Sequence, residues 1–138
     1  MEIRSMTAGD YEKAYQLWSI TPGMNLKSLN NTYEGIKSVI DHNPNLCFVA
    51  VANDQIVGTA LGATDGRKGY LYHVAIDAEF RGQRVGSQLI ERVVQGLKKQ
   101  GITKIGLFTT NENTEGQAFW KHLGWHQRTD ITYLDRDI

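Results

Sequence analysis

Hydrophobic residues recur along the chain at two spacings, and each spacing predicts a different secondary structure. Apolar positions three or four residues apart predict helices over about 8–19, 32–42, 84–100 and 114–123. Runs of apolar or alternating residues predict strands over about 2–6, 46–52, 55–63, 70–76 and 104–110, with one or two more within 125–134. The resulting order, β-α-α-β-β-β-α-β-α-β, is typical of an α+β or mixed α/β fold with a largely antiparallel sheet.

Short polar segments mark the ends of these elements. Thr7 and Asp10 have the spacing of a capping box at the start of the first helix. Asn53-Asp54 lies between two strands and predicts the turn of a hairpin. Gly101 follows two lysines and predicts the end of the long helix. The chain has no internal repeat, low-complexity tract or linker, so we expect a single domain over residues 1–138.

The composition narrows the class of protein. The chain has 138 residues, with 15 Lys+Arg and 15 Asp+Glu, so the formal net charge is zero and binding of nucleic acid by bulk electrostatics is not expected. It has no apolar run long enough to cross a membrane and no N-terminal targeting segment, so we expect a cytoplasmic protein. The single cysteine, Cys47, lies in an apolar run and is expected to be a buried structural thiol rather than a nucleophile.

The most informative stretch runs from Val74 to Leu89, where an apolar strand leads into a short basic loop with glycines and then into the long amphipathic helix. Such a loop directs backbone N–H groups and a helix N-terminus at one place, which favours a phosphate or diphosphate. The glycine spacing fits neither a dinucleotide-binding loop of the Rossmann type nor a Walker loop. An ordinary strand-to-helix turn is the alternative interpretation.

This stretch resembles motif A of the GNAT superfamily of N-acetyltransferases, whose pattern is Arg/Gln-x-x-Gly-x-Gly/Ala. Arg81 occupies its first position and Gly86 its last. The fourth position, usually glycine, is Arg84 here. We therefore expect Arg84 either to adopt a negative φ or to accept modest backbone strain, and its charge adds a cation beside the phosphates.

A second segment, residues 113–125, is similar to motif B of the same superfamily. The matching positions are Asn113, Phe119, Gly124 and Trp125. The two motifs stand in the family's order, with a helix and a strand between them, so the resemblance extends over nearly the whole chain. It implies the GNAT fold: about four helices and a mostly antiparallel sheet of six to seven strands, in which the parallel fourth and fifth strands splay apart.

The resemblance implies acetyl-CoA as cosubstrate and no metal. The loop and helix start would hold the diphosphate through Arg81, Gly82, Gln83, Arg84, Val85, Gly86 and Ser87. The pantetheine arm would pair with the backbone of the strand at Val74, Ala75 and Ile76, and Asn113 and Trp120 would complete the cofactor site. A backbone N–H near Val74 would polarise the thioester carbonyl.

The proton transfers are less well defined. Family members usually carry a tyrosine as general acid on the fourth helix, where this chain has Trp120, and an indole N–H is not a useful acid near neutral pH. The thiolate could leave unaided, Tyr72 or Tyr133 could replace the acid, or the chain could bind CoA with little turnover. The strand at 70–76 has no carboxylate to act as base.

Two side chains of this strand are candidates for the base. His73 has a suitable ordinary pKa but could equally be a satisfied buried histidine, and Tyr72 could order a water that carries the proton. Strict alternation places Tyr70, Tyr72 and Val74 on one face and Leu71, His73 and Ala75 on the other. Tyr72 and His73 are thus the two catalytic candidates.

The residues do not identify the acceptor. Candidates for its pocket are Trp18, Met24, Asn25 and Tyr33, although Trp18 fits the core equally well. We expect an acetyl-CoA-dependent N-acetyltransferase that acts on a primary amine of a small molecule or a protein, and apolar residues near the C-terminal end could support a homodimer. The alternatives are a CoA-sensing module without turnover and transfer of another acyl group, selected near Phe108 and Trp120.

Overall fold

The computed structural model describes residues 1–24, 26–27 and 29–138. These residues form two compact units, 1–108 and 109–138, which are described separately below. The predicted single domain over 1–138 stays a prediction.

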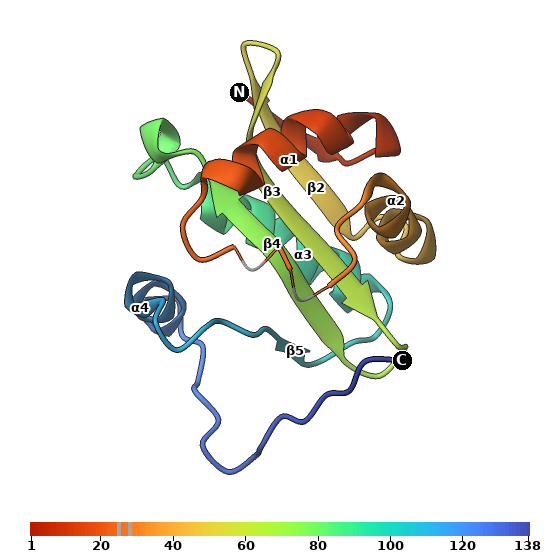
Figure 1. Ribbon diagram of the computed structural model, residues 1–138, viewed down its shortest axis with the longest axis vertical. Helices are drawn as coiled ribbons and strands as arrows, with labels where there is room; N and C mark the ends of the chain where they lie inside the picture. Colours follow the sequence, from red (N-terminus) through yellow and green to blue (C-terminus); the bar gives the residue numbers. More distant parts are fainter. Residues whose placement is uncertain (25, 28) are drawn as a thin grey trace. The chain divides into compact units, whose positions relative to one another are not determined.

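The first unit is built on a mixed sheet with the strand order β1-β2-β3-β4-β5 (Figure 1). Its described strands are β1 (Glu2–Ser5), β2 (Cys47–Ala52), β3 (Gln55–Thr64), β4 (Gly69–Ile76) and β5 (Ile105–Gly106). Neighbours from β1 to β4 are antiparallel, whereas β4 and β5 are parallel. The predicted mixture of a largely antiparallel sheet with one parallel pair is confirmed.

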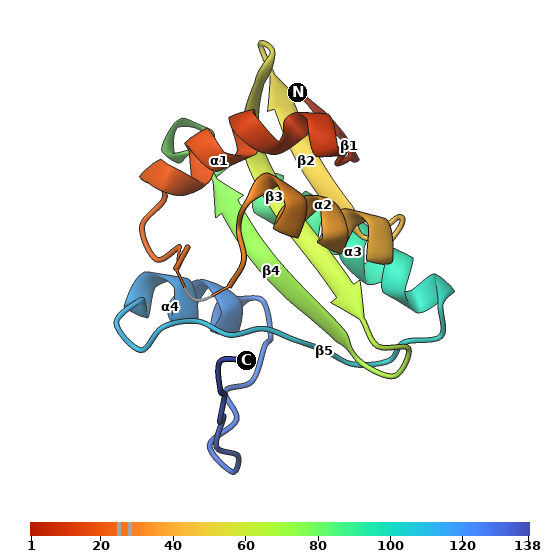
Figure 2. The same cartoon turned by 45° about the vertical axis from the view of Figure 1, so that its right-hand side comes forward.

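Helices cover both faces of this sheet. Figure 2 shows α1 (Tyr11–Ile20) and α2 (Tyr33–His42) on one face and α3 (Val85–Lys99) on the other. Short 3-10 turns, η1 (Ala8–Asp10) and η2 (Ala78–Phe80), precede α1 and α3. Helices α2 and α3 begin and end within one residue of the predicted ranges, because their apolar stripes are long enough to fix both period and length. Helix α1 ends one residue beyond its predicted range but begins three residues later, because residues 8–10 form η1.

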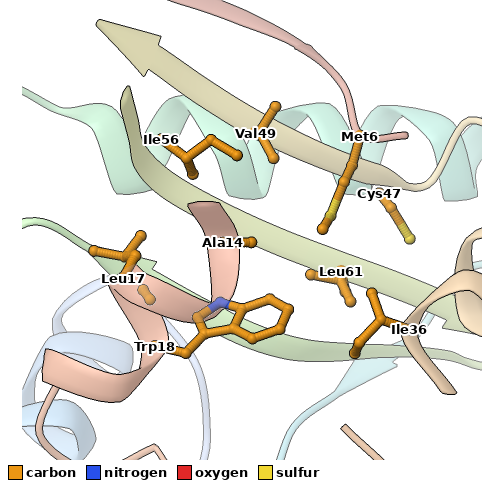
Figure 3. Packing of buried hydrophobic residues seen from close by; sticks show 10 residues of the cluster. Met6, Ala14, Leu17, Trp18, Ile36, Cys47, Val49, Ile56 and Leu61 are labelled. Atoms are coloured by element: carbon orange, nitrogen blue, oxygen red, sulfur yellow. The ribbon is translucent and has the colours of Figure 1, made fainter. Parts of the chain in front are cut away.

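The core between the sheet and α1 and α2 is centred on Trp18. Figure 3 shows its indole reaching from α1 toward Leu61 of β3 and Ile36 of α2, and only 1% of Trp18 is exposed. Cys47 belongs to the same buried cluster, and burial raises the pKa of its thiol to about 11. The prediction of a structural, unreactive thiol is therefore confirmed.

Helix α3 lies close to the other face because β3 carries glycines beneath it. A β-carbon at Gly58 would lie 2.8 Å from Leu89 Cδ1, and one at Gly62 would lie 2.5 Å from Val93 Cγ1. The same added carbon at Gly62 would also lie 2.8 Å from the carbonyl oxygen of Leu46, which is backbone and cannot turn aside. These small residues fix the distance of α3 from the sheet, and so the place of its N-terminus.

The predicted turns are found, with one ion pair beside them. Asn53 and Asp54 have φ angles of 52° and 61°, as a two-residue hairpin with a type I′ turn requires. The N–H of Thr7 donates to Asp10 Oδ2 at 2.9 Å, which is one half of the expected capping box. Arg4 donates two hydrogen bonds of 2.8 Å to the Asp10 carboxylate and lowers its pKa below the ordinary value.

The second unit contains α4 (Thr114–His122), close to the predicted 114–123. Asn113 is the N-cap, and its Oδ1 accepts a hydrogen bond of 3.0 Å from the N–H of Gly116. The ring of Trp120 packs against Phe119 and Trp125, with centroids 5.1 Å away in both cases. Asn113 therefore has a structural role as the N-cap of α4.

The prediction of six to seven strands is wrong for the described part of the chain, which has five. Residues 126–138 are exposed and contain no strand, although strands were expected within 125–134. Apolar residues there are few, and Ile131, Tyr133 and Leu134 are 61–85% exposed, so no buried face supports a strand. The strand expected over 104–110 is reduced to Ile105–Gly106. None of the described helices is both long and apolar enough to span a bilayer.

The close contact of α3 with β3 predicts a loss of stability when Gly62 gains a side chain. We expect Gly62→Ala to lower the free energy of unfolding by about 1–3 kcal/mol, because the added carbon overpacks a buried contact with backbone. Urea denaturation followed by circular dichroism measures this. The matched control is Gly9→Ala, whose added carbon would meet Thr7 Oγ1 at an ordinary 3.6 Å, so its stability should change little. Equal effects of the two substitutions would contradict this description of the α3 contact.

Candidate active site

Strand β4 contains a bulge at the residues where catalysis was predicted. The register pairs Thr59 with Ala75 but Leu61 with Tyr72, so His73 and Val74 together lie opposite Ala60. His73 has a φ of 52°, in the left-handed region that residues with a β-carbon rarely occupy. Such a bulge leaves the ladder locally unpaired and turns the strand.

The bulge overturns the prediction of strict alternation along β4. Leu71 pairs with Gly62, which faces α3, whereas Tyr72 pairs with Leu61, which belongs to the core beneath α1 and α2. Ala75 also joins this core, so Leu71 and Ala75 lie on opposite faces. The extra residue in the strand shifts the period, and as a result Tyr72, His73 and Ala75 are directed to the same side.

The other edge of β4 is paired only at its start. Parallel pairing with β5 is limited to Gly69 with Ile105 and Tyr70 with Gly106. In the described residues, no strand pairs with this edge from Leu71 to Ile76. The N–H of Asp77 donates to the carbonyl of Val57 in β3, so alternation along the strand directs the amide of Ile76 to the open edge. The carbonyl of His73 accepts from Thr59 of β3, and the N–H of Val74 points the opposite way in the same trans peptide, so it is directed to the open edge as well.

The basic loop ends at the N-terminus of α3. The first hydrogen bond of the helix joins Gln88 N–H to the carbonyl of Arg84 at 3.0 Å, and the helix has no side-chain cap. The N–H groups of Val85, Gly86 and Ser87 therefore have no partner inside the helix. Val85 lies against Gly58, the partner of Ile76, which places these amides at the end of β4.

The backbone of the loop is strained at Arg84. Its φ is 63°, so of the two outcomes that the sequence left open, the left-handed one is found. Gly82 has a φ of 79° and adopts it without strain. The side chains of residues 81–84 are exposed, the first turn of α3 has no acidic residue, and the ion pairs among the described residues do not include Arg81 or Arg84. This concentration of positive charge and N–H donors fits a diphosphate.

The side chain of His73 is held on two sides. Its Nε2 lies 2.8 Å from Asn31 Oδ1, and its ring meets the edge of Trp18 with the centroids 4.6 Å apart. Asn31 Nδ2 donates to the carbonyl of Leu26, so Asn31 Oδ1 must accept from His73 and the Nε2 of His73 carries the proton. Burial lowers the pKa of His73 to about 4. A neutral, satisfied histidine with so low a pKa is a weak base.

A cavity of about 460 Å³ adjoins the bulge. It is lined by Leu61, Tyr72 and His73 of the sheet and by residues between Leu29 and Val39, with Glu34 among them. Of the residues predicted for the acceptor pocket, Trp18 is core, Tyr33 is exposed, Met24 packs against the core, and Asn25 lies outside the described residues. Asn31 could not be found from the sequence, because its role depends on a contact with His73, which lies 42 positions away.

The structure thus brings most of the predicted residues to one end of the first unit. Tyr72 and His73 line the cavity, Val74, Ala75 and Ile76 follow them along β4, and the loop from Arg81 to Ser87 leads into α3. Asn113 and Trp120 belong to the second unit, where Trp120 is partly buried among aromatic rings. Among the described residues, no group of three or more potential ligands could hold a metal ion.

The lowered pKa of His73 makes stability depend on pH. The folded state keeps His73 neutral down to about pH 4, whereas the unfolded chain takes up a proton near the ordinary value of 6.5, so protonation favours unfolding. We expect the free energy of unfolding to fall between these two values, by up to about 1.4 kcal/mol per pH unit. Urea denaturation at a series of pH values measures it.

The control for this prediction is His73→Gln, which keeps an N–H donor but does not titrate. Its stability should vary less over the same range. Asp10 also loses stabilisation in acid, but below its ordinary pKa of 3.8, because Arg4 lowers its pKa in the folded state. Identical pH dependence of the two proteins above about pH 4 would show that His73 is not held neutral.

Comparison with known proteins identifies the family of this chain. Residues 11–125 match the sequence profile of the Acetyltransferase (GNAT) family. An acetyltransferase of Pectobacterium atrosepticum is 33% identical over 138 residues, which are all of this chain and 96% of that protein.

Solved structures of low sequence identity share the fold. The aminoglycoside 6'-N-acetyltransferase of Acinetobacter haemolyticus is 15% identical, with a TM-score of 0.78 over 100% of this chain and 99% of that one. The PaiA N-acetyltransferase of Thermoplasma acidophilum, solved with coenzyme A, is 19% identical, with a TM-score of 0.76 over 89% and 87%. The chain therefore belongs to the acetyltransferase (GNAT) family and is an N-acetyltransferase.

Proposed function

We propose that this enzyme transfers the acetyl group of acetyl-CoA to a primary amine of a small molecule or a protein. One observation carries the proposal: the unpartnered amides at the start of α3 and the open edge of β4 lie at the same end of the sheet. A ligand with a diphosphate at the start of α3 and an extended, amide-containing chain along the edge of β4 would have the chemistry of coenzyme A. That a relative was solved with coenzyme A supports this choice of donor.

The loop residues fit the diphosphate by charge and by geometry. The amides of Gly82 to Ser87 would donate to phosphate oxygens, and Arg81 and Arg84 would add charge without having to leave an ion pair among the described residues. The open edge of β4 would accept the pantetheine arm as an additional strand. We further propose that residues 1–138 act as one catalytic domain, since the family profile extends across both units.

When bound, acetyl-CoA would supply a thioester whose carbonyl carbon is open to attack. The amide of Val74, directed to the open edge, would donate to the acyl oxygen as negative charge develops there. The strand and the cavity together would hold the amine and the thioester in contact, and this positioning provides much of the rate enhancement.

The acceptor would enter through the cavity beside Tyr72 and His73. Glu34 at its lining favours a cationic amine, and the apolar Leu61 and Ile36 favour an apolar portion next to it. A protein of the same fold is an aminoglycoside 6'-N-acetyltransferase, which supports the proposal of an amine acceptor for this chain. A cytoplasmic location and a homodimer stay predictions.

The contacts of Tyr72 and His73 narrow the choice of the residue that takes up the proton of the amine. His73 is a poor base because its Nε2–H is engaged by Asn31 and its pKa is near 4. We therefore favour Tyr72, which stacks on Tyr70 and lines the cavity, as the residue that orders a proton-carrying water. On the acid side, the thiolate would leave unprotonated or receive a proton from Tyr72. A part for Tyr133, which belongs to the second unit, stays a prediction.

Charge reversal in the loop tests the cofactor site. We expect Arg81→Glu combined with Arg84→Glu to weaken coenzyme A binding by about 100-fold or more, because two charge-assisted contacts of about 1.5–3 kcal/mol each are lost and about 1.4 kcal/mol corresponds to tenfold. Isothermal titration calorimetry measures the dissociation constant. The matched control is Lys99→Glu at the opposite end of the same helix, which should bind as the wild type does. Equal affinity in all three proteins would contradict the proposed site.

An amine panel tests the reaction itself. The assay detects the CoA thiol released from acetyl-CoA, and the buried Cys47 should not contribute to the signal of the native protein. We expect release above background with at least one class of primary amine. Trp120→Tyr should then raise turnover if loss of the general acid limits the rate, and leave it unchanged if the thiolate departs unaided.

The same panel separates the proposal from its alternative. Tight binding of acetyl-CoA by the wild type with no release for any amine would contradict transfer and favour a CoA-sensing module. In that case a gain of turnover in Trp120→Tyr would identify the missing acid as the cause.

A further inference from the structure

A buried pair of side-chain hydrogen bonds ends on the bulge of β4. The indole N–H of Trp18 donates to Thr59 Oγ1 at 2.8 Å, and the Thr59 hydroxyl donates to the carbonyl oxygen of His73 at 2.6 Å. The directions are fixed, since an indole N–H can only donate and a carbonyl can only accept. Trp18 is 1% exposed and Thr59 0%, so water does not compete for these bonds.

The position of Thr59 is unusual for its chemistry. It is the one hydroxyl side chain between Ile56 and Ala63 of β3, a stretch of apolar residues and glycines. Burial of a hydroxyl is unfavourable unless it is hydrogen-bonded, and here its proton and one lone pair are both used. A valine would fill the same space without this requirement. The hydroxyl therefore has a task at this position beyond packing.

The Thr59 hydroxyl acts on His73, the strained residue of the bulge. A left-handed φ at a residue with a β-carbon costs about 1–3 kcal/mol and persists only where the surroundings enforce it. At His73, Thr59 holds the carbonyl, Asn31 holds the ring nitrogen, and Trp18 packs on the ring. With the carbonyl of His73 held, the peptide that follows is also fixed, because its carbonyl and the N–H of Val74 belong to one plane.

We propose that Thr59, itself oriented by Trp18, is a positioning residue that fixes the peptide between His73 and Val74 so that the Val74 amide points at the acyl oxygen. The inference rests on the proposed function, because it assumes a thioester along the open edge of β4. It assigns to α1 a part in catalysis although no residue of α1 is among those that line the cavity. The phosphate-binding loop is a separate structure, so Thr59 should affect the reaction and not the grip on the cofactor.

The test compares Thr59→Val, which keeps the shape, with Thr59→Ser, which keeps the hydroxyl. The first readout is the backbone amide spectrum by NMR. In Thr59→Val we expect the amide signals of His73 and Val74 to shift, because the peptide between them loses the hydrogen bond that holds its carbonyl. Thr59→Ser should resemble the wild type. Trp18→Phe, which lacks the indole N–H, should change the same two amides to a smaller extent.

The second readout reports on the donor without needing an acceptor. The carbonyl stretch of bound, carbon-13-labelled acetyl-CoA should lie at lower frequency on the wild type than in solution, since a fixed N–H polarises it. Thr59→Val should lose most of this difference and Thr59→Ser should restore it. The dissociation constant of acetyl-CoA should stay within about twofold in every variant.

With the best amine from the panel, Thr59→Val should lower kcat by about 10- to 100-fold at a nearly unchanged KM for acetyl-CoA. The matched control is Thr64→Val. Thr64 also lies in β3, and its hydroxyl also donates to a carbonyl, that of Lys68 at 2.8 Å, but at the turn and away from the bulge. Its kcat should equal that of the wild type.

The outcomes are distinct. Wild-type amide signals and carbonyl frequency in Thr59→Val would overturn the inference, as would a Thr59→Ser variant no better than valine. Failure of the wild type to bind acetyl-CoA would instead refute the proposed function, and the amide spectra would still decide whether Thr59 holds the bulge. If Thr59→Val does not fold, Thr59→Ser and Trp18→Phe decide by the same readouts.

Discussion

Strand β4 has partners on both sides only at Gly69 and Tyr70. Beyond them β5 departs, and one edge of β4 presents backbone groups that no strand takes up among the described residues. An unpaired buried edge is unfavourable, so a fold that keeps one must gain a ligand there or expose it to water. In this chain the open edge leads directly to the N-terminus of α3, where further amides are unpartnered. The loss of one strand partner thereby leaves an extended row of donors, which we propose binds a long anionic ligand.

Two contacts outside this surface decide its geometry. Glycines of β3 let α3 approach the sheet, and their position sets where the helix N-terminus meets the end of β4. On the opposite face, Trp18 and Thr59 hold the bulge that interrupts β4 beside the cavity. The donor and acceptor sides of the proposed reaction thus depend on different helices. We propose that the packing of α3 positions the cofactor site, whereas α1 and the segment before α2 position the reacting centre.

Much of this could be predicted from the sequence because it depends on local patterns. The apolar stripe from Val85 to Leu97 predicts α3, and the basic loop with glycines leads into its N-terminus as expected. The anion site at this place stays a prediction. The motif at Arg81 and Gly86 adds the family, and Cys47 is buried as its apolar neighbours suggest. The predictions that were wrong concern features that depend on contacts between residues far apart in the sequence. The bulge follows from the register of β3 against β4, and the strands expected within 125–134 required a buried face that those residues do not have.

Amide hydrogen exchange of the wild-type enzyme, measured by NMR with and without coenzyme A, tests the central claim most directly. The account predicts that exchange slows by about tenfold or more at Val74, Ile76 and the amides of residues 82–87, since these are the groups that the ligand would engage, while amides at Lys98 and Lys99 keep their rates. Slowing that is absent from both the β4 edge and the start of α3, or confined to other parts of the chain, would contradict it.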